Sequence, residues 1–260
     1  MKNLVLAVSP DSSLELLKRY ADILILDKDF DEVVDSYYDT VYIRSHFSQL
    51  STMPQNFRKE INDVVQRTKD TNHKIKFIDD MDNVDAIVAF EDKWQQYITF
   101  GKFMARTEIL DSHTDMSSYE RPIYKNRLSS RGSGVTWDRQ KTVEAINGWI
   151  VQESLDIREE LRIYIILGEV YSIGAVKQSM TEENGAQSVD SRGLAKDEID
   201  FSARIIQQFP SLDIAGIDIA RTIDGDLFLL EVNRSPGFAK FYDLTGINLA
   251  DKLYEKLSFE

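Results

Sequence analysis

The sequence predicts an α+β protein in which a small α/β domain precedes a larger domain built mainly from strands. Short apolar runs alternate with helical patterns through about the first third of the chain, which is typical of an open sheet with helices packed on it. From Ile123 onward, strand patterns instead follow one another through tight turns. Near the C-terminus, the turn dipeptide Asp224-Gly225 lies between two apolar runs and predicts a β-hairpin.

The N-terminal third carries the signals of a small α/β domain. Asp11, Ser12 and Ser13 supply N-cap groups for a helix that begins near Leu14. No glycine-rich fingerprint follows the first apolar run, which argues against a Rossmann dinucleotide site. The predicted strands are 4–8, 23–26, 40–44 and 74–78, and a polar amphipathic helix is predicted over 56–69.

We place the domain boundary after residue 88. Residues 1–88 are expected to form the N-terminal α/β domain and residues 89–260 the larger domain, with a central subdomain of about 89–155 and a C-terminal subdomain of about 156–260. The predicted elements of the larger domain are one or two helices within 82–100, strands at 109–110, 123–125, 134–137, 149–153, 161–167 and 170–176, a hairpin turn at Gly168-Glu169, a mobile loop over 179–193, and helices over 196–209 and 246–257.

The composition argues against several classes of protein. A formal net charge of −13 does not suit a protein that binds nucleic-acid backbones, because that task requires an excess of Lys and Arg. The absence of cysteine rules out disulfides and fits a reducing compartment. The apolar run at 4–8 is too short for a signal peptide or a membrane span. We therefore expect a cytoplasmic protein that binds neither nucleic acid nor a membrane.

Strand register in the C-terminal hairpin predicts a metal site. With a two-residue turn at Asp224-Gly225, Asp218 lies opposite Glu231, and Asn233 shares a face with Glu231. Like charges directly opposite each other are destabilising, especially among apolar neighbours, so a divalent cation would resolve the conflict. Oxygen ligands of this kind suit Mg²⁺ bound together with substrate phosphates. The alternative is a hairpin whose acids face solvent.

Cations along the chain predict a phosphate site. The serine and glycine segment 129–134 follows the strand with Lys125, and small residues let backbone amides approach an anion closely. The alternative is a flexible turn, but a lysine in an apolar strand is costly to bury without an anion. Arg162 and Lys177 also interrupt apolar strands, unless they are outward-facing residues of a two-sided sheet, and Lys93 adds a fourth cation. The three histidines are scattered, which argues against a zinc site or a Ser-His-Asp triad.

An ordered series of motifs runs through the larger domain. These motifs are DKWQQY (92–97), IYKNRLSSRGSGV (123–135), WIVQESL (149–155), ELRIYIILGEVYSIGAVKQ (160–178), and the C-terminal AGIDIA, LFLLEVNRSPG and TGINLA segments. The series resembles the ATP-grasp superfamily, and is most similar to its branch of ribosomal-protein glutamate ligases (RimK-like) and related peptide-modifying ligases. The similarity extends from about residue 75 to residue 257. It implies an ATP-grasp fold preceded by a small pre-ATP-grasp α/β domain.

The resemblance implies a nucleotide site. Lys93 and Lys125 match the two lysines that contact the ATP phosphates. The flexible loop that closes over the phosphates corresponds to Ser129, Ser130, Arg131, Gly132, Ser133 and Gly134. The hinge whose backbone pairs with adenine corresponds to Glu153, Ser154 and Leu155. Glu160 stands where the family usually has the aspartate of an Asp-x-Arg element, the position of a ribose contact.

The resemblance also implies the metal ligands and the basic residues of the reaction. The metal ligands that it implies are Asp218, Glu231 and Asn233, in agreement with the register argument. Arg162 and Lys177 match basic positions near the transferred phosphate and acyl group. The segment 179–193 departs from the usual Arg-x-Asn substrate motif, and Arg192 is a candidate to replace part of it.

The activity implied by the resemblance is that of an ATP-dependent carboxylate–amine ligase. Such an enzyme uses ATP with Mg²⁺, or Mn²⁺, to convert a carboxylate into an acyl phosphate, which an amine then attacks. The expected substrates are a peptide, a protein or small molecules that carry the carboxylate and the amine. Two alternatives stay open: an ATP-grasp enzyme with a non-amine acceptor, and a catalytically inactive nucleotide-binding protein that regulates or scaffolds a partner. Assembly into a homo-oligomer is also left open.

Overall fold

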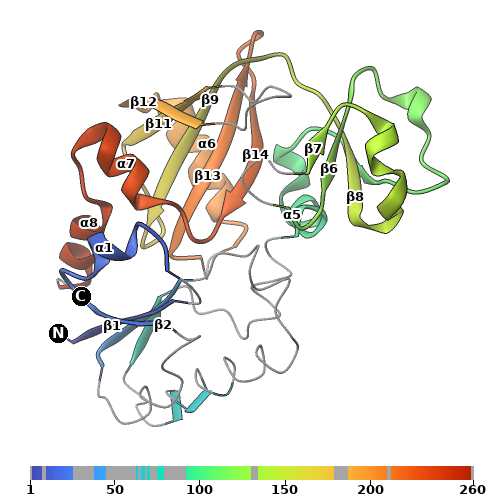
Figure 1. Ribbon diagram of the computed structural model, residues 1–260. Coiled ribbons are helices and arrows are strands. Elements are labelled where there is room, and N and C mark those ends of the chain that lie inside the picture. Colours follow the sequence, from blue (N-terminus) through green and yellow to red (C-terminus); the bar gives the residue numbers. More distant parts are fainter. Residues whose placement is uncertain are drawn as a thin grey trace.

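The computed structural model describes three β-sheets that follow one another along the chain (Figure 1). The described residues are 2–7, 10–25, 38–44, 63, 66–67, 69–70, 75–78, 92–129, 134–178, 187–209 and 212–258. We call the sheets N-terminal, central and C-terminal. The mixture of helices and strands confirms the predicted α+β class, while the predicted boundary at residue 88 lies outside the described residues.

The N-terminal sheet is parallel, with the strand order β2-β1-β3-β4. Its strands are β1 (Asn3–Ala7), β2 (Asp22–Ile25), β3 (Thr40–Arg44) and β4 (Lys76–Ile78), and α1 (Leu14–Leu17) follows β1. All residues of β1 and β3 are buried, as expected of parallel strands covered on both faces, which explains the apolar runs 4–7 and 41–43 within them. The four strand predictions are therefore confirmed to within about two residues at each end. The helix predicted over 56–69 lies mostly outside the described residues.

The central sheet is antiparallel, with the order β5-β8-β6-β7. Its strands are β5 (Thr107–Ile109), β6 (Pro122–Asn126), β7 (Val135–Thr136) and β8 (Trp149–Glu153). The helical segments around it are α5 (Lys93–Phe100), η2 (Gly101–Phe103), η3 (Met116–Ser118) and η4 (Arg139–Gly148). Helix α5 begins after Asp92, whose carboxylate accepts a hydrogen bond from the Trp94 amide. The first part of the helix predicted over 82–100 lies outside the described residues.

The C-terminal sheet has the order β12-β11-β9-β13-β14, and β10 pairs with β9 (Figure 1). Its strands are β9 (Ile157–Ile166), β10 (Glu169–Val170), β11 (Ile173–Gln178), β12 (Gln187–Gly193), β13 (Ile214–Thr222) and β14 (Leu227–Asn233). Its helices are α6 (Lys196–Ile206), α7 (Phe238–Thr245) and α8 (Leu249–Leu257). No helix in the described ranges is both long enough and apolar enough to cross a bilayer.

Two local predictions for this part of the chain were wrong, and one helix was missed. The turn after β9 is Leu167-Gly168, one residue before the predicted position, and both residues have positive φ values of 49° and 72°. The segment 179–193 is not a loop throughout, because its second half forms β12 and pairs with β11. The helix predicted over 246–257 is present as α8, and a separate helix that was not predicted, α7, precedes it and ends where Gly246 takes a φ of 70°. Such a left-handed residue stops a helix and favours glycine.

The hairpin turn between β13 and β14 also differs from the prediction. A two-residue turn at Asp224-Gly225 requires Ile223 to pair with Asp226. Instead, the Thr222 amide donates to the Asp226 carbonyl at 2.9 Å, so the turn contains the three residues 223–225. This longer turn shifts the register of the adjacent residues by one, and Arg221 pairs with Leu227.

Apolar residues pack on both faces of the C-terminal sheet. Along β9, Leu161, Ile163 and Ile165 belong to a cluster that includes residues of α6. Tyr164 and Ile166 belong to a second cluster that includes residues of α7 and α8. We call these the α6 face and the α7 face. Both clusters continue into the N-terminal sheet, so the first strands of the chain share a core with the last helices.

Candidate active site

A row of charged side chains crosses the α7 face of the C-terminal sheet. Arg162 on β9 pairs with Asp218 on β13, and Asp218 pairs with Glu231 on β14. Directly opposed residues project from the same face, so the three side chains lie side by side. On the other side of Arg162 the neighbour is the small residue Ala175. In the next row, Lys177 of β11 lies opposite Glu160 of β9.

The predicted pairing of Asp218 with Glu231 is correct, although the predicted turn is not. A bulge makes up the difference, because Asp218 pairs with Glu231 while the next residue, Ile219, pairs with Leu229. Leu230 is therefore the extra residue of β14, as in a β-bulge. The one-residue shift at the turn and the one-residue bulge compensate each other.

Asp218 is neutralised by protein cations. Its Oδ1 and Oδ2 atoms accept hydrogen bonds from Arg162 Nε and Nη2, both at 2.6 Å, and Oδ2 also accepts one from Lys177 Nζ at 2.8 Å. Burial alone would raise the pKa of Asp218, but the two cations outweigh it and lower the pKa to about 2. The sequence predicts that only a divalent ion would neutralise the charge of Asp218. This expectation is corrected, because two protein cations already neutralise it. Glu231 has no such partner within the described residues.

The close approach of Arg162 to the following loop depends on a glycine. Gly216 of β13 pairs with Asn233 of β14. A Cβ atom at Gly216 would lie 2.9 Å from Pro236 Cβ and 3.4 Å from Arg162 Cδ. The lack of a side chain therefore lets the guanidinium stem and the loop after β14 pack against this part of the strand.

Glu160 lies in the same cluster but is not a free ribose ligand. Its side chain is buried, with a carboxylate oxygen 3.8 Å from Lys177 Nζ. Burial raises its pKa, and the neighbouring charge of Asp218 raises it further, against the opposing effect of Lys177. The structure thus places the side chain among the charges of the sheet, and the predicted ribose contact stays a prediction.

On the central sheet, Lys125 points to a polar partner. Its Nζ donates to Gln152 Oε1 at 2.6 Å, and Gln152 Nε2 donates to Thr107 Oγ1 at 2.7 Å. Burial, followed by the nearby positive charge of Lys93, lowers the pKa of Lys125 to about 8. Lys93 Nζ donates to the carbonyl oxygen of Ser129. Lys93 therefore reaches the start of the serine and glycine segment, of which Ser130, Arg131, Gly132 and Ser133 lie outside the described residues.

The resemblance implies that Lys125 contacts the ATP phosphates, and for such a contact its lowered pKa predicts that nucleotide affinity depends on pH. Below pH 8 the side chain is an ammonium ion that attracts phosphate oxygens, and above pH 8 the free enzyme increasingly loses this charge. We expect the dissociation constant of ATP to rise as the pH increases from 7 to 9.5, measured by isothermal titration calorimetry. The Lys125→Arg variant keeps its charge over this range and should lose that pH dependence. An unchanged pH profile in this variant would assign the effect to another group.

The hinge segment leaves one backbone donor available. The Glu153 amide donates to the Arg106 carbonyl at 2.9 Å, and the Ser154 amide donates to the Arg121 carbonyl at 2.8 Å. The Glu153 carboxylate is also engaged, since it accepts the amides of Glu120 and Arg121. Within the described residues, the amide of Leu155 has no acceptor. Of the three residues that the resemblance assigns to the hinge, Leu155 is therefore the one whose amide has no acceptor among the described residues.

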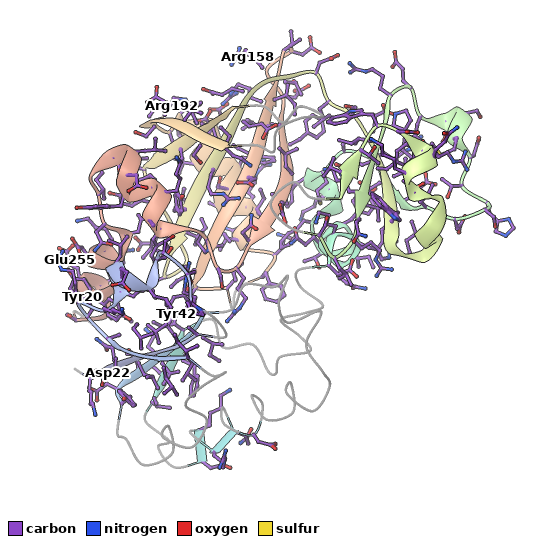
Figure 2. All side chains as sticks on the ribbon, viewed as in Figure 1. Tyr20, Asp22, Tyr42, Arg158, Arg192 and Glu255 are labelled. Atoms are coloured by element: carbon purple, nitrogen blue, oxygen red, sulfur yellow. The ribbon has the colours of Figure 1, made fainter. Side chains whose placement is uncertain are left out.

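Arg192 does not join the active-site cluster. It lies on β12 (Figure 2), where its guanidinium binds Glu198 of α6 at 2.8 Å and Glu159 of β9. Glu159 alternates with Glu160 along β9, so Arg192 occupies the α6 face, opposite to Lys177. The suggestion that Arg192 replaces part of a substrate motif is corrected, because this side chain belongs to a network of ion pairs on the α6 face of the sheet.

Two glutamines of the site were missed from the sequence. Gln152 holds Lys125, and Gln96 of α5 forms two hydrogen bonds with the backbone of Val232. The exposed fractions of Gln96 and Gln152 are only 2% and 4%. An uncharged polar residue within an apolar strand pattern, such as the glutamine of WIVQE in β8, could have indicated a buried polar contact. The pattern does not show which residue the glutamine binds.

The donor set of the cluster suits magnesium. The amide nitrogen of Asn233 is buried without a hydrogen-bond partner among the described residues, so it can donate to an acceptor such as a phosphate oxygen, while the side-chain oxygen is the atom that could bind the metal. A carboxylate has about four acceptor positions, and three bonds from Arg162 and Lys177 leave Asp218 one of them. Within the described residues there is no group of three His, Cys, Asp or Glu side chains that could hold a metal. A mixed site of two carboxylates and an amide, completed by phosphate oxygens, fits these observations.

Comparison with known proteins identifies the family. The model of the RimK-like ATP-grasp domain matches residues 104–257, which is more than half of the chain. The chain belongs to the RimK-like ATP-grasp family. The predicted family, the ATP-grasp fold and the ligase class of the enzyme are thereby confirmed. A search of curated protein sequences gives no significant match.

Solved ATP-grasp ligases share the fold of the whole chain. The ligase PsnB, complexed with a minimal precursor, superimposes with a TM-score of 0.69 and 17% identity, covering 97% of this chain and 98% of the other. D-cycloserine synthetase DcsG gives a TM-score of 0.67 with 16% identity, covering 98% and 99% of the two chains. The macrocyclase MdnC from Microcystis aeruginosa MRC, bound with its precursor peptide MdnA, gives 0.65 with 16% identity and 100% coverage of both chains.

Proposed function

We propose that the protein is an ATP- and Mg²⁺-dependent carboxylate–amine ligase that acts on a peptide or protein through an acyl phosphate. The observation that carries this proposal is the row of Arg162, Asp218 and Glu231 on one face of the sheet, beside Lys177. Paired cations and acids within one row are what phosphoryl transfer requires, since its catalysis comes mainly from positioning and charge stabilisation. The RimK-like family supports the ligase chemistry.

A peptide substrate is supported by two of the structural relatives. PsnB is described in complexes with precursor peptide, and MdnC with the precursor peptide MdnA. A third relative, DcsG, is a D-cycloserine synthetase, so the fold also serves the synthesis of a small molecule. We further propose the division into residues 1–88, about 89–155 and about 156–260, which corresponds to one sheet in each part.

The metal would be held by Asp218, Glu231 and Asn233. Bound Mg²⁺ would supply positive charge that offsets the charge of the ATP phosphates. PsnB has been solved with Mg and ADP, which supports this assignment for the present chain. Asp218 stays ionised throughout the working pH range because its pKa is about 2. Asp218 would therefore carry its negative charge when the metal binds.

Arg162 and Lys177 would stabilise the charge that develops during transfer. Both side chains are anchored by Asp218, which orders them before a substrate binds. In the first step, the substrate carboxylate attacks the γ-phosphorus, a new C–O–P linkage forms, and ADP leaves. In the second step, an amine nitrogen attacks the acyl carbon, inorganic phosphate leaves, and the amine proton passes to solvent. No covalent protein nucleophile is required in either step.

The nucleotide would lie between the central sheet and the C-terminal sheet. Lys93 and Lys125 would bind its phosphates, with the serine and glycine segment 129–134 over them, and the Leu155 amide would bind adenine. Glycine is needed within that segment, because Gly134 has a φ of 76° and an added Cβ would lie 2.8 Å from Ser129 Oγ. Close backbone approach of this kind is used elsewhere to bind anions.

The proposal is tested by measuring ADP release with ATP, Mg²⁺ and panels of candidate peptides and amino acids. An accepted substrate pair should release ADP and phosphate in equal amounts and yield a product lighter than the two substrates by one water. Mg²⁺ with ATP should also raise the unfolding temperature. Thermal stabilisation without ADP release for any pair would favour the alternative of a nucleotide-binding regulatory protein. Release of ADP and phosphate with retention of a free amine would favour a non-amine acceptor.

A further inference from the structure

The side chain of Gln96 connects α5 to the strand that carries two of the metal-ligand candidates. Gln96 Nε2 donates to the Val232 carbonyl at 2.8 Å, and the Val232 amide donates to Gln96 Oε1 at 2.9 Å. Gln96 is 2% exposed, so both bonds are shielded from water. Figure 1 shows α5 next to β14, at the junction of the central and C-terminal sheets.

Val232 is the residue between Glu231 and Asn233. Its side chain is buried in the cluster on the α6 face, whereas the neighbouring side chains project from the α7 face. Among the described strands, β14 pairs only with β13, so the outward amide and carbonyl of Val232 lie along a sheet edge. A buried edge without partners is costly. Gln96 satisfies both groups with one side chain, in the manner of a short neighbouring strand.

The N-terminal end of α5 is fixed to the proposed phosphate side of the site. Arg127 follows β6 and binds the capping residue Asp92 through two hydrogen bonds of 2.6 and 3.1 Å. The Lys93 amide donates to the Arg127 carbonyl at 3.1 Å. Lys93 is thus held at the first position of α5, and Lys125 lies two residues before Arg127. One short helix therefore connects both lysines to β14.

We propose that Gln96 is a positioning residue that fixes Glu231 and Asn233 relative to Lys93 and Lys125, and thereby sets the distance between the metal and the phosphate contacts. Its own amide group is fully engaged by Val232, so it acts through the backbone of β14 and not on the substrate. This role rests on the proposed function, because it requires that Glu231 and Asn233 bind a metal carried by the nucleotide.

The test compares ADP binding with and without Mg²⁺ in the Gln96→Leu variant, by isothermal titration calorimetry. Leucine keeps most of the side-chain volume and loses both hydrogen bonds. We expect the Mg²⁺-dependent gain in ADP affinity to fall by about tenfold, while ADP affinity measured with a chelator stays unchanged, because the hinge contacts do not involve β14. Hydrogen exchange of the peptide that contains Val232 should be faster in this variant.

A matched control is Gln95→Leu, which makes the same change one residue earlier on α5. The Gln95 side chain has no hydrogen bond to the described residues and is expected to behave like the wild type. If Gln96→Leu does not fold, Gln96→Met provides a more flexible side chain for the same measurement. A lower unfolding temperature with an unchanged Mg²⁺-dependent gain would show a purely structural role and overturn the proposal. A wild-type protein with no Mg²⁺-dependent gain would instead contradict the proposed function.

Discussion

Replacing Asp218 by asparagine is expected to lower the rate of ATP turnover by a factor of about 10² to 10³. The substitution removes one charge from the proposed metal site and also the anion that holds Arg162 and Lys177. These two cations would then be buried with less compensation and would adopt other positions. The rate is measured as ADP release with an accepted substrate pair, and the folded state is checked by circular dichroism.

The control for this variant is Asp224→Asn. Asp224 lies in the exposed turn of the same hairpin, remote from the charged row. The substitution is the same, from aspartate to asparagine. It should retain the rate of the wild type. Turnover in Asp218→Asn within about threefold of the wild type would exclude Asp218 from the reaction.

The pH profile adds a second criterion to the Asp218 prediction. A carboxylate with a pKa of about 2 does not titrate in the range where the enzyme is assayed. Any loss of activity between pH 5 and 7 must therefore come from another group. Glu160 is the group to test, because it lies in the same cluster and burial raises its pKa above the usual value. The acid limb of the profile should disappear or move in Glu160→Gln. It should remain in Asp218 variants that retain measurable activity but move to lower pH, because the charge of Asp218 raises the pKa of Glu160.

The sequence located the charged row because the row depends on local periodicity. Alternation along a strand is sufficient to put Glu231 and Asn233 on one face, and the hairpin places Asp218 opposite. The turn itself was wrong by one residue. The pairing survived only because the bulge at Leu230 restored the register, and nothing in the local pattern indicates that bulge.

Contacts between distant segments could not be predicted in this way. Arg192 was expected near the substrate, but its direction depends on which face of β12 meets Glu159 and Glu198. Gln96 is separated from Val232 by 136 positions, and a helical pattern does not identify a partner so far along the chain. The same applies to Asp218, whose partners come from two other strands. Propensity and periodicity describe one element, whereas these bonds arise when elements pack together.

The N-terminal sheet supplies a contact to the loop that follows the metal-ligand candidates. Arg44, at the end of β3, has a fully buried side chain. Its Nε donates to Asp11 at 2.8 Å, and its Nη2 donates to the carbonyl of Pro236 at 3.0 Å. Ser13 Oγ accepts the amide of Phe238 at 2.9 Å, at the start of α7. Ser13 therefore acts on α7 and not as the predicted side-chain cap of α1.

Replacing Arg44 by methionine is expected to destabilise the protein by about 3–5 kcal/mol, because it breaks a largely buried ion pair by removing the guanidinium that forms two hydrogen bonds with the Asp11 carboxylate. The side chain of Asp11 is only 9% exposed, so water cannot replace the lost partner. The measurement is urea-induced unfolding followed by circular dichroism. As a control, Lys252→Met removes one member of an ion pair in which both side chains are about half exposed, and its unfolding midpoint should hardly change.

A double variant separates the cost of removing one charge of the ion pair from the loss of the hydrogen bond to Pro236. Asp11→Asn combined with Arg44→Met removes both charges, so it should recover part of the stability lost in Arg44→Met. The double variant still lacks the hydrogen bond to the Pro236 carbonyl, because the donor of that bond is the Arg44 side chain. If the N-terminal sheet helps to place the loop after Asn233, the double variant should unfold at a higher midpoint than Arg44→Met and yet show a smaller stabilisation by Mg²⁺ with ATP than the wild type. Equal stabilisation by Mg²⁺ with ATP in the double variant and the wild type would limit Arg44 to a role in folding.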